Sequence, residues 1–188
     1  MKHFIYLIIL SIIFTNKTYT QSIKKKIDKI ILNEFNDSKG PGGVFMVTKN
    51  GKPIYEKAFG KANLELGVDL TTNNVFQLAS MTKQFTAISI LMLEEQGKLN
   101  TLDSISKYIP DYPNGNKITI HHLLTHTSGI KDFTKMKSLK DIAQKEMSPK
   151  MMVDFFKDEP VDFEPGEKFE YSNSGYILLG YLIELTSG

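Results

Sequence analysis

Two β-rich segments joined by an Asn-Gly turn place the tightest constraint on how this chain can fold. They cover residues 44–48 and 54–59, with Lys49-Asn50-Gly51-Lys52 between them. Asn-Gly is the strongest short-range signal of a β-hairpin, because both turn residues must accept positive φ angles. A lone hairpin is only marginally stable in water. No later segment reads as a partner strand, so either the hairpin packs on a helix or the other strands of its sheet lie outside these 188 residues.

Helical periodicity accounts for much of the remaining sequence. Apolar residues at helical spacing predict helices over residues 22–35, 80–96, 119–126, 138–146 and 149–157, and a last helix that follows Asn173-Ser174 and stops at residues 186–188. In the second of these helices, the expected buried stripe consists of Phe85, Ile88, Leu91 and Met92, with Gly97 as C-terminal cap. A helix, a hairpin and then further helices, in that order, predict an α+β fold.

The composition excludes several classes of function. With 41% hydrophobic and 23% charged residues, the chain resembles a soluble globular protein. Its 23 basic residues are all lysines and are nearly balanced by 21 acidic ones, which argues against nucleic-acid binding. Because there is no cysteine, disulfides, thiolate nucleophiles and cysteine-ligated metals are excluded. The chemistry must come from Ser, Lys, Tyr, His or carboxylate groups, and we expect no cofactor.

Residues 1–20 have the pattern of a secretory signal peptide. A short basic start precedes an apolar run from Phe4 to Phe14, and small polar residues follow near a possible cleavage site after Thr20. The eleven residues of this run are too few to span a bilayer, and the alternative is a buried first helix. We therefore expect a secreted or periplasmic protein whose mature chain begins near Gln21, has no membrane span and is close to neutral.

Ser80 and Lys83 form an S-x-x-K pattern at the start of the long helix. Residues three apart on a helix lie about 5–6 Å apart at Cβ, so a neutral lysine could accept the proton of an attacking serine. The N–H groups at a helix N-terminus would stabilise the resulting oxyanion. The alternative is an exposed serine beside a solvated lysine, because the same spacing recurs in this lysine-rich chain. Its other copies begin at Ser22, Ser104 and Ser128.

Tyr171-Ser172-Asn173, just before the last expected helix, could supply further polar groups. A loop tyrosine can exchange a proton with a leaving group, and an asparagine amide can orient a substrate carbonyl while bonding to a lysine. Alternatively, Asn173 or Ser174 caps the helix and Tyr171 packs. A second Y-x-N triplet, at Tyr112-Pro113-Asn114, shows that the pattern alone is weak.

His122 and His126 have the i, i+4 spacing of metal ligands on one helix face. No acidic residue occupies the glutamate position of an H-E-x-x-H motif, so we expect no metal. A capping or loop-bracing role is expected for His126 instead.

Three segments stand in a distinctive order: FQLASMTKQFTA, LLTHTSGI and FEPGEKFEYSNSGYILLGYLIELTSG. Together they resemble the serine β-lactamase and penicillin-binding-protein-like superfamily over about residues 42–188, most of all its class C β-lactamase, D-alanyl-D-alanine carboxypeptidase and esterase branch. The resemblance implies a β-lactamase/transpeptidase-like fold, in which an antiparallel sheet is flanked by helices and carries a helical subdomain. It also implies that Ser80 is the acylated nucleophile and Lys83 its proton acceptor. Tyr171 would be the acid/base for the leaving group, and Asn173 would orient the substrate.

The third motif of that family, K-T-G or H-x-G on a later strand, has no match after Tyr171. We therefore expect residues 21–188 to be the N-terminal part of an incomplete domain without its C-terminal strands, and to have little or no hydrolase activity alone. Two functions remain open. One is a serine hydrolase or acyltransferase acting on a small-molecule or peptide carbonyl compound, namely a β-lactam, a D-alanyl peptide or an ester. The other is a truncated, noncatalytic remnant that at most binds such a compound.

Overall fold

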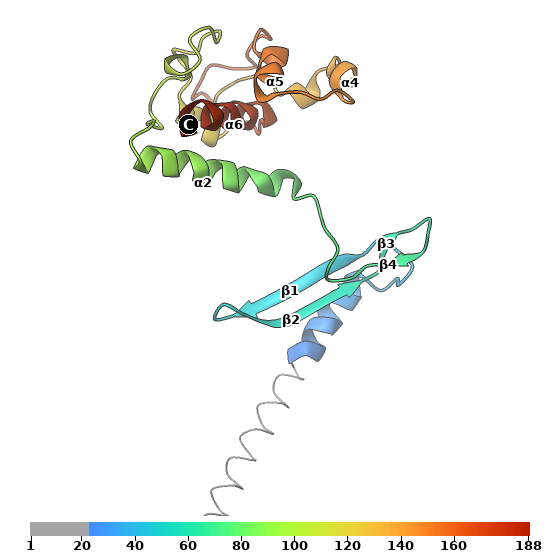
Figure 1. Ribbon diagram of the computed structural model, residues 1–188. Helices are drawn as coiled ribbons and strands as arrows, with labels where there is room; N and C mark the ends of the chain where they lie inside the picture. The colour runs from blue at the N-terminus through green and yellow to red at the C-terminus, as the bar shows by residue number, and fades with distance from the viewer. Residues whose placement is uncertain (1–22) are drawn as a thin grey trace, which may run out of the picture. The chain divides into compact units, whose positions relative to one another are not determined.

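The computed structural model describes residues 23–188, which form two compact units divided after Gln77 (Figure 1). Each unit has buried apolar residues of its own. The segment expected to be a signal peptide, residues 1–20, lies outside the described residues, so cleavage and export stay predictions.

The first unit contains the expected hairpin. Four strands form two antiparallel pairs: β1 (Gly43–Lys49) with β2 (Lys52–Phe59), and β3 (Lys61–Asn63) with β4 (Val68–Asp69). The turn residues Asn50 and Gly51 have φ angles of 51° and 73°, which confirms the prediction from the Asn-Gly sequence. No third strand joins β1 and β2 in the described part of the chain. The short second pair was not predicted.

A helix over residues 23–34 packs against this hairpin. At its end, the Phe35 ring meets the Phe45 ring edge-on, with 5.1 Å between centroids. The Tyr55 hydroxyl donates a 2.7 Å hydrogen bond to Asp28 of the helix. Burial, together with this carboxylate, raises the pKa of Tyr55 to about 12, so the phenol keeps its proton at neutral pH. The hairpin thus gains its cover from a helix, which is one of the two arrangements that the sequence left open.

The second unit is helical. Its α-helices are α2 (Thr82–Glu95), α3 (Ile120–Leu124), α4 (Leu139–Ile142), α5 (Pro149–Phe156) and α6 (Asn173–Ser187). Its 3-10 turns are η1 (Ala79–Met81), η2 (Ile105–Lys107) and η3 (Phe133–Lys135). Helix α6 packs against α2, α3 and α5 (Figure 1). Its residues Leu178, Leu179 and Leu182 are fully buried, so α6 forms the centre of this core.

Local hydrogen bonds and backbone geometry decide where several of these helices begin and end. Ser148 caps α5 through its hydroxyl, as predicted. The helix expected over residues 119–126 ends at Leu124, and His126 already has a left-handed φ of 59°. The helix expected over residues 138–146 is reduced to α4. It has neither a side-chain cap nor a buried residue to stabilise a longer helix.

Helix α2 turns a different face to the core than its periodicity predicted. Its buried residues are Ile90 and Leu93, in the helix that packs against α6. The predicted stripe is wrong, because each of its members is more than half exposed: Phe85, Ile88, Leu91 and Met92. The helix is apolar on more than one face, so spacing alone did not select the face that α6 covers. No helix within residues 23–188 is long and apolar enough to cross a membrane.

Gly129 is a position where the backbone leaves no room for a side chain. Its φ is +73°, and a Cβ there would overlap the Phe163 carbonyl oxygen, whereas Gly97 has a similar φ of +69° in open space. We expect Gly97→Ala to lower the free energy of unfolding by about 1–2 kcal/mol, the cost of a left-handed alanine. Gly129→Ala should cost about 2 kcal/mol more, because the chain at Phe163 must also move. Urea denaturation followed by circular dichroism measures both, and equal losses would contradict this account.

Candidate functional site

Ser80 lies in the 3-10 turn η1, and the α-helix begins at Thr82, slightly later than the sequence predicted. The preceding residue, Ala79, has a φ of +47°, which is uncommon for a residue with a side chain. Ser80 is the second residue of this turn, and the backbone N–H groups of a first helical turn have no acceptor within the helix. The exposed serine therefore presents both a hydroxyl and a free N–H donor.

Lys83 lies one helical turn beyond Ser80 and bonds back to it. Its Nζ is 3.3 Å from Ser80 Oγ and donates a 2.9 Å hydrogen bond to Asn173 Oδ1. In the copies of the S-x-x-K pattern at Ser104 and Ser128, the lysine bonds instead to an aspartate. These pairs are Lys107 with Asp103 and Lys131 with Asp162. Of the copies that lie wholly within residues 23–188, only the one at Ser80 joins its lysine to its own serine.

Tyr171 approaches the same serine from the loop before α6. Its hydroxyl donates a 2.8 Å hydrogen bond to Ser80 Oγ, and Lys83 Nζ lies 4.9 Å from the centre of its ring. The neighbouring Lys83 ammonium and the Ser80 hydroxyl lower the pKa of the Tyr171 phenol, against a smaller opposing effect of burial. Tyr171 is 41% exposed, and although its ring lies against His126, its hydroxyl is directed to Ser80.

Asn173 is the first residue of α6, but it is not the helix cap. The cap is Ser172, whose hydroxyl accepts a hydrogen bond from the Gly175 N–H. Capping therefore falls to neither of the two residues proposed from the sequence. The structure brings together all four predicted site residues, with Lys83 bonded to both Ser80 and Asn173 and with the Tyr171 hydroxyl bonded to Ser80 Oγ.

His126 braces the loop that carries Tyr171, as expected. Its Nδ1 accepts a 3.2 Å hydrogen bond from the Ser172 N–H, and its ring lies 4.6 Å from the Tyr171 ring and 5.0 Å from the Tyr176 ring. Burial, and then the nearby Lys83 ammonium, lower the pKa of His126, which favours the neutral imidazole that can accept this bond.

His122 serves a different element. Its Nδ1 accepts a hydrogen bond from the Thr119 N–H and completes the capping box of α3. Within the part of the chain that the structure describes, no three metal-ligating side chains gather in one place.

Asp132 is a residue of this site that sequence reasoning missed. It is 4% exposed, and its carboxylate accepts hydrogen bonds from Thr134 and from Asn173. Burial by itself would raise the pKa of Asp132, but these hydrogen bonds outweigh it and hold the pKa below its usual value. Asp132 and Asn173 are 41 residues apart, so no local spacing could have signalled their contact.

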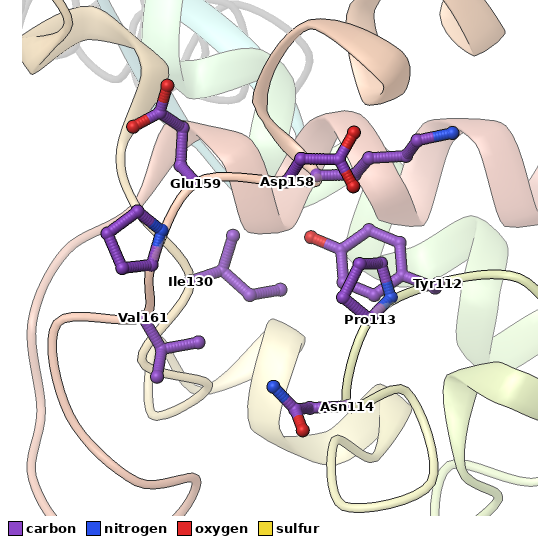
Figure 2. A pocket seen from close by; sticks show the side chains of 9 residues that line it. Tyr112, Pro113, Asn114, Ile130, Asp158, Glu159 and Val161 are labelled. Carbon is purple, nitrogen blue, oxygen red and sulfur yellow. The ribbon is translucent and has the colours of Figure 1, made fainter.

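A cavity of about 270 Å³ lies elsewhere in the second unit (Figure 2). The members of the second Y-x-N triplet, Tyr112 and Asn114, line it together with Ile130 and Val161. None of the four predicted site residues belongs to its lining. The two Y-x-N triplets therefore lie at different places in the second unit, and the one that begins at Tyr171 lies beside Ser80.

The contact between Lys83 and Tyr171 gives a pH-dependent prediction. In Lys83→Met the pKa of Tyr171 should rise, because the cation that favours its phenolate is lost. Lys131→Met is the matched control, since Lys131 pairs with Asp162 at 2.7 Å, and it should leave the Tyr171 titration unchanged. Nuclear magnetic resonance of ¹³C-labelled tyrosine follows each phenol separately. Superimposable Tyr171 curves in the unaltered chain and Lys83→Met would show that the lysine does not act on this phenol.

Comparisons with known proteins agree on one family. A profile described as Beta-lactamase matches residues 27–188. Penicillin-binding protein 4* of Bacillus subtilis (strain 168) is 37% identical over 148 residues, which are 78% of this chain and 33% of that protein. The chain therefore spans about a third of the length of this curated relative.

Solved structures show the same relationship. The octameric penicillin-binding protein homologue from Pyrococcus abyssi is 33% identical with a TM-score of 0.72, over 87% of this chain and 39% of that one. The penicillin binding protein from Bacillus halodurans is 35% identical with a TM-score of 0.71, over 85% of this chain and 48% of that one. These neighbours confirm the predicted α+β, β-lactamase-like fold class. The chain belongs to the Beta-lactamase family, whose members include β-lactamase-type and penicillin-binding-protein-type serine hydrolases.

Proposed function

We propose that this chain carries the acylation site of a serine hydrolase or acyltransferase, with Ser80 as its nucleophile. The observation that carries the proposal is the convergence of two proton-exchanging groups on one hydroxyl. Tyr171 lies 2.8 Å and Lys83 lies 3.3 Å from Ser80 Oγ. A nucleophile within hydrogen-bond reach of a base, which is itself held by a third group, is the arrangement that covalent catalysis requires. Here the third group is Asn173.

The proposed reaction balances with these groups. In the state in which the pair formed by Tyr171 and Lys83 lacks one proton, Ser80 Oγ attacks the substrate carbonyl carbon while its own proton passes to that pair. The Ser80 N–H, which lies in the first turn of η1, stabilises the oxyanion of the tetrahedral intermediate. Collapse of the intermediate breaks the bond to the leaving group, which takes up the proton from Tyr171. Water or another acceptor then attacks the ester on Ser80 and restores the serine hydroxyl.

The substrate is proposed only as a class: a β-lactam, a D-alanyl peptide or an ester. Relatives named as penicillin-binding proteins make a penicillin the first compound to test. A reactive phosphonate ester is the second, because it phosphonylates a serine nucleophile, with loss of its ester leaving group, and does not require a lactam ring.

Covalent labelling of the chain tests the assignment of Ser80. A fluorescent penicillin and a phosphonate probe should each add one group to the peptide that contains Ser80, detected by mass spectrometry. In Ser80→Ala the adduct should fall to background, because no other hydroxyl within residues 23–188 is held by both Lys83 and Tyr171. Ser104→Ala is the matched control, since it removes another S-x-x-K serine whose lysine bonds to Asp103, and it should be labelled like the unaltered chain.

The same experiment separates the two functions that the sequence left open. Reversible penicillin binding without an adduct would favour the noncatalytic alternative, and labelling that survives Ser80→Ala would reject this nucleophile. Single labelling events are detected even when turnover is slow. The expected low hydrolase activity of the chain therefore does not obscure the result.

We also propose that the protein is exported, on the basis of the signal-peptide pattern in residues 1–20. Expression in a bacterial host should release a mature chain that begins near Gln21 into the periplasm or medium. Sequencing the N-terminus of the released protein measures this, and a chain that still began at Met1 would refute cleavage.

A further inference from the structure

Behind Asn173, away from the serine, lies the buried carboxylate of Asp132. One of its oxygens, Oδ2, accepts hydrogen bonds from both the main-chain N–H and the side-chain Nδ2 of Asn173, at 3.2 and 3.1 Å. The other oxygen, Oδ1, accepts from the N–H and the hydroxyl of Thr134, at 2.9 and 2.8 Å. Both oxygens are thus engaged, and the carboxylate cannot rotate without losing hydrogen bonds in a buried position.

This carboxylate decides which way the Asn173 amide points. An amide has a donor end and an acceptor end, whereas an ionised carboxylate only accepts. The NH₂ group must therefore face Asp132, which leaves the amide oxygen facing Lys83 Nζ at 2.9 Å. We propose that Asp132 is a positioning residue of the Ser80 site, which holds the Asn173 amide with its oxygen toward Lys83.

Loss of the carboxylate would act on the serine through two intermediaries. Without Asp132 the amide could turn over and present its NH₂ group to the lysine ammonium, so that two donors would face each other. Lys83 would then lose the acceptor that holds it beside Ser80 Oγ. The effect on acylation rests on the proposed function. The orientation of the amide does not.

The orientation can be measured without any substrate. In ¹⁵N nuclear magnetic resonance of the 188-residue chain, the two side-chain NH₂ protons of Asn173 should exchange slowly with solvent. In Asp132→Asn, which keeps the size of the side chain but loses one acceptor oxygen, their chemical shifts should change and their exchange should become at least about tenfold faster. Asp162→Asn is the matched control, because it too removes a loop carboxylate, one that is bonded to Lys131 and not to Asn173, and it should leave the Asn173 signals unchanged.

The rate of covalent labelling then tests the consequence for the site. With the phosphonate probe, Asp132→Asn and Asn173→Ala should each slow labelling of Ser80 by about 10- to 100-fold, the usual range for a misplaced catalytic group. The double variant should be no slower than Asn173→Ala alone, because Asp132 acts through that side chain. Asp162→Asn should be labelled at the unaltered rate.

The outcomes are distinct. Unchanged Asn173 signals in Asp132→Asn, or rate losses that multiply in the double variant, would overturn the positioning role. Failure of the unaltered chain to be labelled would overturn the proposed function instead, while the amide measurement would still decide the role of Asp132.

If circular dichroism shows that Asp132→Asn does not fold, the variant Thr134→Val replaces it, because this substitution removes only the hydroxyl that anchors the carboxylate. It should change the same Asn173 signals to a smaller extent, and unchanged signals would again overturn the proposal.

Discussion

The geometry of the site depends on how the first turn of α6 is bonded to the loop at residues 131–134. Ser174 is wholly buried there, and its hydroxyl donates to the Lys131 carbonyl at 2.6 Å and accepts from the Phe133 N–H at 2.9 Å. Each of these bonds would cost about 1–3 kcal/mol if it were broken and its buried partner left unsatisfied. The junction therefore fixes where α6 begins. The position of Asn173 beside Lys83 follows from it.

The four groups of the hydrogen-bonded chain that leads from Asp132 to Ser80 differ in electrostatic character. Asp132 is an anion, the Asn173 amide is a neutral dipole, Lys83 is a basic amine and Tyr171 is a phenol. A direct pair between Asp132 and Lys83 would draw the lysine toward the carboxylate and away from the serine. The interposed amide holds the lysine with a single oxygen, so its remaining N–H groups stay available to Ser80.

Features that a few consecutive residues encode could be predicted from the sequence. The Asn50-Gly51 turn and the Ser148 cap are of this kind, because each depends on the conformational or hydrogen-bonding preference of its own residues. Ser80, Lys83, Tyr171 and Asn173 could be identified because their motifs lie in a recognisable order along the chain. The structure shows that these four side chains meet, and their roles remain to be tested by labelling.

Features that depend on contacts between distant segments could not be predicted. The contact of Asp132 with Asn173 joins a loop to the first turn of α6, and nothing local distinguishes that aspartate from others. The buried face of α2 was misassigned for a related reason. The helix offers more than one apolar face, and only the position of α6 decides that Ile90 and Leu93 are covered.

The left-handed backbone at Ala79 has a consequence for the entropy of the reaction. A glycine there would adopt the same φ of +47° without strain, but it would also admit many other backbone conformations next to Ser80. Alanine makes this turn more costly to form, but it also has fewer other backbone conformations available than glycine. Because that conformational freedom is already lost in the folded chain, the serine gives up less of it when it becomes acylated.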